Sequence, residues 1–357
     1  MTNKVKTIGI FGGGQLGQML SQAAASLGFK TCIYSPDENS PAFMYSDYQI
    51  IAEYDDINKL DEFVEKIDFA TIEFENIPID TIQFISNKIR IFPPINAIEI
   101  SQDRIKEKNF CRKSGIKTNR FQNIESEKDL KSWDFSTKSV LKTRMLGYDG
   151  KGQIVVNSYQ EALDAFNIMG QYPCIIEEFV YFSKEISTIT ARDKFGSIFT
   201  FPPSENIHKN HILDETNVPA NISKELEIEL YQTSANILEN LKYIGILSIE
   251  FFMEKDSQAI LVNEIAPRVH NSGHWTLDGS NISQFEQHIR AISGMKIVEP
   301  ELLFKTRMLN LIGEDVNEWN INDSNEKQKI YIYGKDKIKK GRKMGHVNFI
   351  NDEQTEK

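Results

Sequence analysis

The chain has 357 residues, a length that suggests two or three domains. Its 40% of hydrophobic and 26% of charged residues allow large buried cores and exclude general disorder. A formal net charge of −10 argues against nonspecific binding to nucleic acid or to a membrane surface. Cys32, Cys111 and Cys174 lack the spacing of metal ligands, and no apolar stretch is long enough to span a membrane. We therefore expect a cytoplasmic protein with reduced thiols and with neither nucleic-acid nor membrane partners.

The first 94 residues alternate between predicted strands and helices. Strands are predicted at Thr7–Phe11 and at residues 30–34, 69–74 and 89–92, with a helix at residues 18–27. This order is typical of βαβ units with a parallel sheet, in which ligands bind at the carboxyl ends of the strands. The two prolines at positions 93 and 94 mark the expected end of this part of the chain.

Residues 12–17 follow the first strand and fit the pattern G-x-G-x-x-G. Glycines let backbone N–H groups approach an anion at a helix N-terminus, so this pattern often binds a dinucleotide. Such a site also needs an acidic residue at the end of the second strand, but here Pro36 intervenes before Asp37. An NAD-dependent dehydrogenase is therefore a poor interpretation. Contact with a phosphate or a substrate edge through Gln15 is favoured, and a tight turn that serves only packing stays open.

A glycine-rich loop at residues 147–152 follows a predicted helix at residues 95–114. It joins strands predicted at residues 139–141 and 154–157, and the segment 142–153 contains three glycines and two lysines. A flexible, cationic flap of this kind can cover a polyphosphate with backbone N–H and ammonium groups. It is not a Walker A motif, because no Gly-Lys-Ser/Thr opens a helix. The alternative is a mobile surface hairpin.

A β-rich pattern covers residues 174–265, interrupted by a helix predicted at Lys224–Leu241. Strands at residues 247–253 and 260–265 form a predicted hairpin that carries Glu250 and Glu264. A lone carboxylate among isoleucine and phenylalanine is costly to bury, and a second one raises the cost unless a cation neutralises both. Magnesium, bound by one or two carboxylates and by substrate phosphate oxygens, would do so. The alternative is that Glu250 faces solvent on an edge strand.

Two further segments are rich in groups that bind anions. The loop directly after Glu264 contains Arg268, His270, Asn271 and Ser272. Dense polar donors beside a metal suit an anionic substrate or transition state, although a loop can have this composition by chance. A basic tail at residues 331–348 contains Lys335, Arg342 and Lys343. In an acidic chain this tail predicts either a phosphate clamp or a solvated charged surface.

Taken together, these segments resemble the ATP-grasp ligases from about residue 6 to residue 348. The most specific pieces are residues 12–17, 73–76, 102–104, 147–153, 263–274 and 342–347, which occur in the same order. Within this superfamily the chain is most similar to the enzymes of purine biosynthesis that carboxylate 5-aminoimidazole ribonucleotide. The resemblance implies an α/β and α+β ATP-grasp fold with three domains. These are an N-terminal Rossmann-like domain at 1–94, an ATP-grasp domain at 95–295 with a mobile lid at about 117–180, and a small β-rich C-terminal domain at 296–350 before a tail at 351–357.

The resemblance also implies an activity. Bicarbonate would attack the γ-phosphate of ATP, and the amine of aminoimidazole ribonucleotide would capture the carboxyl group of the resulting carboxyphosphate. The implied cofactors are ATP and Mg²⁺, for which Mn²⁺ could substitute, and the implied assembly is a homodimer. Two rival interpretations stay open: another ATP-grasp ligase, such as a formate-dependent glycinamide ribonucleotide formyltransferase, and a non-catalytic nucleotide-binding module. The complete set of predicted metal and nucleotide residues argues against the second rival.

Site residues follow from the resemblance position by position. Those expected at the nucleotide are Arg104, Lys142, Gly147, Tyr148, Asp149, Gly150, Lys151, Gly152, Gln153, Glu177, Glu178, Phe179, Val180, Glu185, His208, Asn263 and Glu264. Those expected at the ribonucleotide and bicarbonate are Gln15, Leu16, Glu75, Asn76, Tyr148, Asp149, Arg268, His270, Asn271, Ser272, Lys335, Arg342 and Lys343. Glu250 and Glu264 would bind the metal, and the residues expected in catalysis are Lys142, Asp149, Lys151, Arg268 and His270. Many relatives have arginine where this chain has Lys151, which keeps the charge but loses the bidentate fork.

Overall fold

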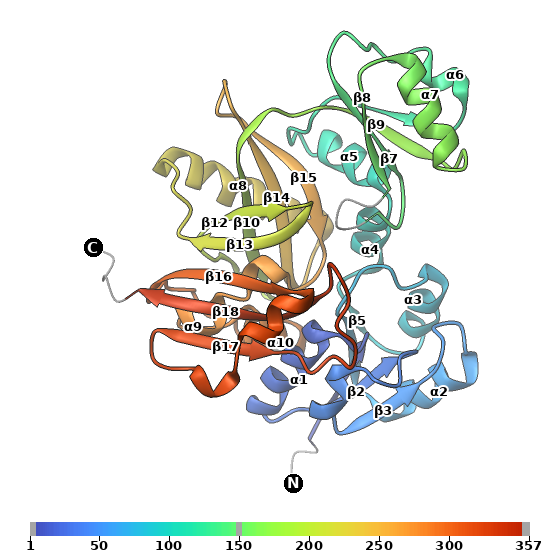
Figure 1. Ribbon diagram of the computed structural model, residues 1–357. Helices are drawn as coiled ribbons and strands as arrows, with labels where there is room; N and C mark the ends of the chain where they lie inside the picture. The colour runs from blue at the N-terminus through green and yellow to red at the C-terminus, as the bar shows by residue number, and fades with distance from the viewer. Residues whose placement is uncertain (1–4, 148–151, 352–357) are drawn as a thin grey trace.

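The computed structural model describes residues 5–147 and 152–351, and its N-terminal part is a parallel sheet. The strands lie in the order β3-β2-β1-β4-β5, which confirms the predicted βαβ arrangement (Figure 1). Their bounds are β1 Thr7–Phe11, β2 Lys30–Ser35, β3 Tyr48–Ile51, β4 Phe69–Ile72 and β5 Ile91–Phe92. The helices are α1 Gln15–Ser26, α2 Ile57–Lys66 and α3 Ile79–Ser86, with a 3₁₀ turn at Pro41–Tyr45. All of β1 is buried, as expected of a strand covered on both faces.

The single helix predicted at residues 95–114 is wrong, because two helices occupy this segment. They are α4 Ile95–Gln102 and α5 Arg104–Lys113. The break falls at Asp103, whose backbone is extended and whose carboxylate accepts a hydrogen bond from the N–H of Ile105 at 2.9 Å. An N-cap residue must leave the helical conformation, so this capping divides the segment.

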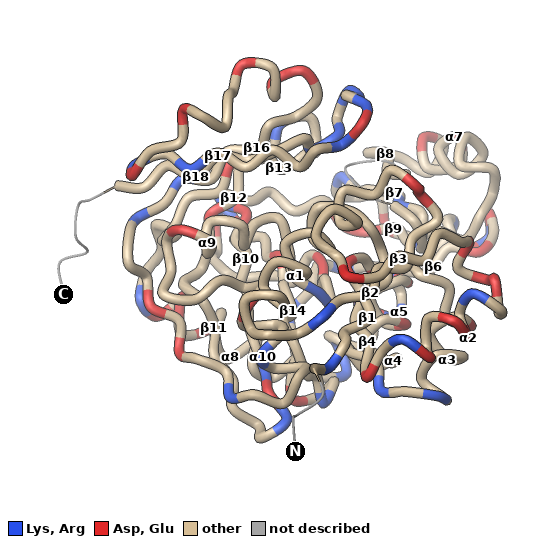
Figure 2. The backbone as a smooth tube through the Cα atoms, turned by 90° about the horizontal axis from the view of Figure 1, so that it is seen from below, with Lys and Arg blue, Asp and Glu red and all other residues tan. Residues whose placement is uncertain are grey.

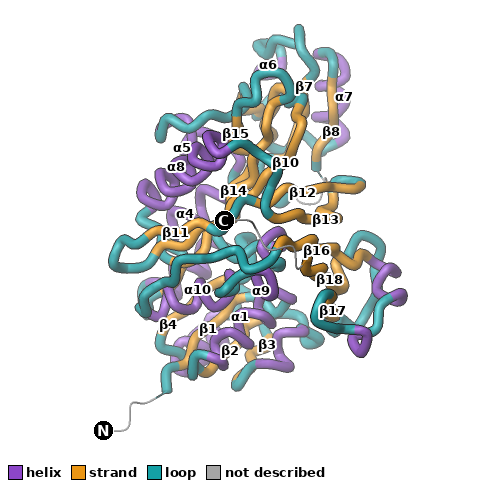
Figure 3. The backbone as a smooth tube through the Cα atoms, turned by 90° about the vertical axis from the view of Figure 1, so that its left-hand side faces the viewer, coloured by secondary structure: helices purple, strands orange, loops and turns teal. Residues whose placement is uncertain are grey.

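A small antiparallel sheet follows, in the order β6-β9-β7-β8. Its strands are β6 Phe121–Ile124, β7 Ser139–Thr143, β8 Gln153–Val156 and β9 Cys174–Glu178, with helices α6 Glu127–Leu130 and α7 Tyr159–Ile168. The apolar side chains of these elements form their own buried cluster. This sheet stands apart at one end of the molecule in both Figure 1 and Figure 3. The predicted hairpin is therefore β7–β8, and residues 148–151 at its tip lie outside the described residues.

The central sheet has the order β15-β14-β10-β12-β13-β16-β18-β17, with β11 paired to β10. Its first strands are β10 Phe182–Arg192, β11 Ile198–Thr200, β12 Ser204–Lys209, β13 Ile212–Val218, β14 Gly245–Glu254 and β15 Ile260–Ala266. Its last strands are β16 Lys305–Ile312, β17 Gln328–Ile332 and β18 Lys343–Asn351. The helices are α8 Lys224–Leu241, α9 Thr276–Gly279 and α10 Gln284–Ser293, with 3₁₀ turns at Asn271–Gly273, Gly313–Glu318 and Ile321–Asp323.

The C-terminal strands extend this sheet, because β16 pairs with β13 and with β18. Residues 331–332 and 343–348 of the predicted basic tail thus belong to the sheet that carries the Glu250–Glu264 hairpin, whereas residues 333–342 are in no strand. The domain boundaries given above stay predictions.

One buried apolar cluster joins the N-terminal sheet to the central sheet. It includes Ile8 of β1 and Ile189 of β10, together with Leu20 of helix α1 and Phe285 and Ile289 of helix α10. Each such side chain contributes roughly 1.5–3 kcal/mol when fully buried, so this contact holds the two parts in a fixed relation. Acidic and basic residues are interspersed along the chain in the view of Figure 2. Among the described helices, none is long and apolar enough to cross a membrane.

Candidate active site

A cleft of about 560 Å³ runs between the small sheet and the central sheet. Residues from β7, β8 and β9 form one wall, and residues from β10, β12, β14 and β15 form the other. Concave sites of 300–1,000 Å³ with convergent polar groups are typical of small-molecule binding. The cleft is lined by many of the residues predicted above: Glu75, Arg104, Lys142, Gly147, Gln153, Glu177, Glu178, Phe179, Val180, Glu185, His208, Glu250, Asn263, Glu264, Arg268, His270 and Lys343.

Two carboxylates face the cleft from neighbouring strands. Glu250 on β14 pairs in register with Glu264 on β15. Burial, followed by the nearby charge of Glu264, raises the pKa of Glu250 to about 7. The side chain of Glu250 is only 23% exposed and lines the cleft, so it does not project into bulk solvent.

This carboxylate pair fits a magnesium ion. Its donors are hard oxygens from two residues, and its open side faces the space where phosphate oxygens would complete the coordination. A cation there would remove the cost of holding two like charges together. Within the described residues no group of three or more His, Cys, Asp and Glu side chains has the arrangement of an all-protein metal site.

A buried ion pair joins two strands of the small sheet at the wall of the cleft. The ammonium of Lys142 on β7 lies 2.7 Å from the carboxylate of Glu177 on β9. Asn119 donates to the same carboxylate oxygen at 3.1 Å. Burial alone would raise the pKa of Glu177, but the ammonium of Lys142 holds it well below its usual value. Glu177, which was expected at the nucleotide, lines the cleft, and its carboxylate fixes the position of Lys142.

His208 and Glu185 form a second ion pair across β12 and β10. Burial lowers the pKa of His208, but the contact with Glu185 outweighs burial and leaves the pKa above its usual value. A protonated His208 would hold the Glu185 carboxylate at the wall of the cleft.

Arg268 and Glu75 tie the loop after β15 to the end of β4. The Arg268 guanidinium donates to both carboxylate oxygens of Glu75, one of them at 3.2 Å. Burial opposes ionisation of Glu75, but the guanidinium keeps its pKa below the usual value. The pair therefore joins two segments that lie 193 residues apart in the sequence.

His270 is held in one orientation by its neighbours. Its Nδ1 accepts the N–H of Ser272 at 3.3 Å, so the ring proton belongs on Nε2, which faces Glu250 at 3.7 Å. The Ser272 hydroxyl lies 2.9 Å from Nδ1, and Gln284 bonds both the N–H and the C=O of His270. Burial and the charge of Arg268 lower the pKa of His270 well below its usual value. The ring is therefore neutral.

The glycine-rich turn at residues 12–17 binds a carboxylate of its own chain. The N–H groups of Gly14 and Gly17 donate to the two oxygens of Glu73, at 2.5 and 2.6 Å. Gly12 has φ +103°, and a Cβ at Gly14 would lie 2.8 Å from a Glu73 oxygen. These two N–H groups already have an acceptor, so the interpretation of this turn as a tight packing unit explains their arrangement.

Several predicted residues lie elsewhere than the cleft wall. The Leu16 side chain is buried in the apolar core, and the Asn271 amide exchanges two hydrogen bonds with Asn310. Ser272 is buried behind His270, where its hydroxyl oxygen accepts a hydrogen bond from the hydroxyl of Ser187 at 2.8 Å. Other predicted residues are not part of the described cleft wall, namely Gln15, Asn76, Gly152, Lys335 and Arg342. Tyr148, Asp149, Gly150 and Lys151 lie outside the described residues.

Comparison with known proteins decides the family. Residues 5–102 match the ribonucleotide synthetase preATP-grasp domain, residues 109–285 the ATP-grasp domain, and residues 306–357 the phosphoribosylaminoimidazole carboxylase C-terminal domain. The N5-carboxyaminoimidazole ribonucleotide synthase of Brucella melitensis is 42% identical over 348 residues, which are 96% of this chain and 96% of that protein. The chain belongs to the N5-carboxyaminoimidazole ribonucleotide synthase family.

Solved structures of this synthase family share the whole fold. The Staphylococcus aureus N5-carboxyaminoimidazole synthetase complexed with ADP has a TM-score of 0.91 and 35% identity, covering 98% of this chain and 94% of that one. The Aspergillus clavatus synthase in complex with ADP and 5-aminoimidazole ribonucleotide has a TM-score of 0.88 and 26% identity, covering 97% and 94%. The chain is thus an ATP-grasp ligase, which sets aside the dehydrogenase and the non-catalytic binding module.

Sequence reasoning missed several residues that line the cleft or support residues near it. Phe182 and Phe252 form a stacked pair with ring centroids 4.7 Å apart at its wall. Asn119 supports Glu177, and Glu73 fills the glycine turn. Glu73 stands in a segment that carried the resemblance, but no spacing rule shows which of its two glutamates turns inward. Lys108, four residues after Arg104, did give a signal, because that spacing places both on one helix face.

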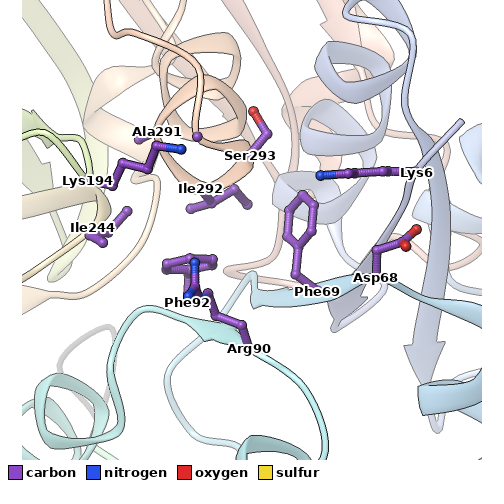
Figure 4. Close-up of a pocket in the computed structure, with 11 residues that line it drawn as sticks. Lys6, Asp68, Phe69, Arg90, Phe92, Lys194, Ile244, Ala291, Ile292 and Ser293 are labelled. Atoms are coloured by element: carbon purple, nitrogen blue, oxygen red, sulfur yellow. The ribbon is translucent and has the colours of Figure 1, made fainter. Parts of the chain in front are cut away.

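A smaller hollow of about 270 Å³ lies at the opposite edge of the N-terminal sheet of this synthase. Figure 4 shows Lys6, Arg90 and Lys194 around an apolar floor that includes Phe69 and Phe92. The hollow lies where β1 and β4 begin, whereas ligands of parallel sheets bind where strands end. The larger cleft is therefore the candidate active site.

Proposed function

We propose that the cleft catalyses the ATP-dependent carboxylation of 5-aminoimidazole ribonucleotide by bicarbonate. The products are N5-carboxyaminoimidazole ribonucleotide, ADP and phosphate. The observation that carries the proposal is that the facing pair of Glu250 and Glu264 lines the same cleft as Lys142, Arg268 and His270. One cleft thus contains the proposed metal ligands together with cationic groups for the nucleotide and for an anionic substrate.

The nucleotide end lies between the two sheets. Lys142 would offset charge on the γ-phosphoryl group, and Arg104, which lies 3.6 Å from Glu264, would meet the phosphates from the helix side. Glu178, Phe179 and Val180 line the cleft where the adenine would lie. A bound magnesium ion, held by Glu250 and Glu264, would supply charge stabilisation for phosphoryl transfer.

The reaction balances in two steps. An oxygen of bicarbonate forms a bond to the γ-phosphorus while the bond to the ADP leaving oxygen breaks, which gives carboxyphosphate. The exocyclic amine then forms a bond to the carboxyl carbon, and the carbon–oxygen bond to phosphate breaks. Arg268, fixed by Glu75, would hold the carboxyl group close to the amine.

Neither of the two described candidates, Glu75 and His270, is a strong enough base to accept the proton of the amine. The Glu75 carboxylate is engaged with Arg268 on both oxygens, and its pKa is lowered. His270 is neutral with a lowered pKa, so it is a weak base. We propose that the departing phosphate accepts the proton. Asp149, the third candidate, lies outside the described residues.

The ribose 5-phosphate would bind beside Lys343, a residue of the cleft wall, and next to Lys335 and Arg342, which lie outside that wall. Lys335 donates to the backbone oxygen of Lys343 at 2.6 Å, and its pKa falls to about 8 through burial and the nearby charge of Arg342. Closely placed cations of this kind favour an anion between them. We propose that Lys335, Arg342 and Lys343 bind the phosphate. The homodimer and the substitution of magnesium by manganese stay predictions.

One assay separates this function from the formyltransferase. ADP release is measured with ATP and Mg²⁺ plus either bicarbonate with aminoimidazole ribonucleotide or formate with glycinamide ribonucleotide. We expect release only with the first pair, and Glu264→Gln should abolish it while the circular dichroism spectrum stays unchanged. Release with the second pair, or full activity of the variant, would contradict the proposal.

A further inference from the structure

One face of helix α5 points at the strand that carries Glu264. Arg104 and Lys108 are one helical turn apart, so both project toward β15. The ammonium of Lys108 donates to the backbone oxygens of Val262 at 2.9 Å and Asn263 at 3.1 Å. The residue is only 2% exposed, and it is not part of the cleft wall described above. Lys108 therefore contacts the backbone of β15 from a buried position.

The strand is irregular at the point that Lys108 contacts. Glu264 pairs with Glu250, but the next pair along β14 is Phe251 with Val262, so Asn263 is an extra residue in the ladder. In a regular strand, consecutive side chains face opposite sides of the sheet. Here Asn263 and Glu264 both line the cleft, whereas Val262 is buried. The bulge is what brings two consecutive polar side chains to the same wall.

A bulge disturbs the backbone pairing around its extra residue. The ammonium of Lys108 supplies a donor to the carbonyl of that residue and to the carbonyl before it. Its helix is anchored as well, since the N–H of Arg104 donates to the backbone oxygen of Arg144 at 3.0 Å and Asp103 caps the first turn. The donor therefore comes from a helix with a fixed start.

We propose that Lys108 is a positioning residue for the metal-binding strand: its ammonium holds the bulge at Asn263, so that Asn263 and Glu264 face the nucleotide together. It acts through the backbone of β15 and touches neither ATP nor metal. This inference rests on the proposed role of Glu264 in binding magnesium.

The test measures ADP binding by calorimetry over a range of Mg²⁺ concentrations and in chelator. Lys108→Met keeps the length and apolar stem of the side chain but removes its donors. We expect it to raise the Mg²⁺ concentration for half-maximal enhancement of ADP binding at least tenfold, with less than a twofold change in chelator. Lys106→Met, an exposed neighbour on the same helix, should match the wild type.

Lys108→Arg provides a second variant, since a guanidinium can donate to both carbonyls. It should restore most of the Mg²⁺ response, and it keeps the inference testable if the methionine variant does not fold. Equal weakening of ADP binding with and without Mg²⁺, or a wild-type response in Lys108→Met, would overturn the inference. A wild-type protein whose ADP binding ignores Mg²⁺ would instead overturn the metal site itself.

Discussion

At the scale of single residues, the site depends on charges that are buried in pairs. Lys142 with Glu177 and Arg268 with Glu75 are each a cation and a carboxylate held by further hydrogen bonds. Breaking such a buried pair by removing one partner typically costs about 3–5 kcal/mol. Glu250 differs, because the residue opposite it on the adjoining strand is a second carboxylate, Glu264, and not a cation. Its missing compensation is what a magnesium ion would supply.

This unbalanced pair predicts a pH dependence of stability without metal. The pKa of Glu250 is raised from 4.5 to about 7, so the folded protein binds a proton more tightly than the unfolded chain. Its contribution is therefore fully present below pH 4.5 and is lost as the pH rises toward 7, by on the order of 2–3 kcal/mol. Chemical denaturation of the wild type and of Glu250→Gln in chelator, between pH 5 and 8, isolates this term.

Adding Mg²⁺ at pH 7 should stabilise the wild type and leave Glu250→Gln nearly unchanged. The raised pKa of Glu250 would be contradicted if the wild type became more stable, relative to Glu250→Gln, as the pH rises from 5 to 8 in chelator.

At the scale of elements, much of the fold follows from sequence patterns, and the differences have local causes. Lys224–Leu241 is a helix with the predicted bounds, because Ser223 caps it and its apolar spacing is regular. The helix predicted at residues 95–114 fails at Asp103, whose role as a cap depends on a conformation that periodicity does not show. The strand predicted at residues 69–74 ends at Ile72, and the next residue turns to bind the glycine turn.

The two hydrogen bonds that Glu73 accepts from the glycine turn should contribute to the stability of the protein. A glutamine offers one acceptor oxygen, so in Glu73→Gln one of the N–H groups of Gly14 and Gly17 would face an NH₂ group instead. Leaving a buried donor unsatisfied costs about 1–3 kcal/mol. Thermal unfolding should show this loss, with Glu99→Gln on the neighbouring helix α4 as the control. An unchanged melting temperature would mean that the turn does not depend on the carboxylate.

At the scale of the whole molecule, the site joins segments that are far apart in the chain. Glu75 follows the N-terminal sheet, Arg268 follows the central hairpin, and Lys343 begins a C-terminal strand, yet all three line one cleft. The resemblance to the ATP-grasp ligases predicted all three of these residues. Sequence alone does not show that β16 pairs with β13, nor that Asn271 is engaged with Asn310, because both depend on tertiary packing.

If the phosphate clamp at Lys335, Arg342 and Lys343 binds the ribonucleotide, changing Arg342 should weaken binding of that substrate and not of ATP. Arg342→Ala removes a cation at the proposed phosphate end, and a charge-assisted hydrogen bond contributes about 1.5–3 kcal/mol. The KM for the ribonucleotide should rise roughly 10–100-fold, since 1.4 kcal/mol is a tenfold change. The KM for ATP should change less than about twofold. Steady-state kinetics with each substrate varied in turn, and with the exposed Lys339→Ala as control, measures this division. Equal effects on both KM values would argue against the clamp.

The most direct test of the proposed reaction follows the atoms of bicarbonate. Bicarbonate labelled with heavy carbon and heavy oxygen is supplied with ATP, Mg²⁺ and aminoimidazole ribonucleotide, and the products are analysed by mass spectrometry and NMR. Transfer through carboxyphosphate predicts heavy carbon in the N-carboxyl group of the ribonucleotide and one heavy oxygen in the released phosphate. Phosphate that takes its new oxygen from water, or a ribonucleotide without the labelled carboxyl group, would contradict it.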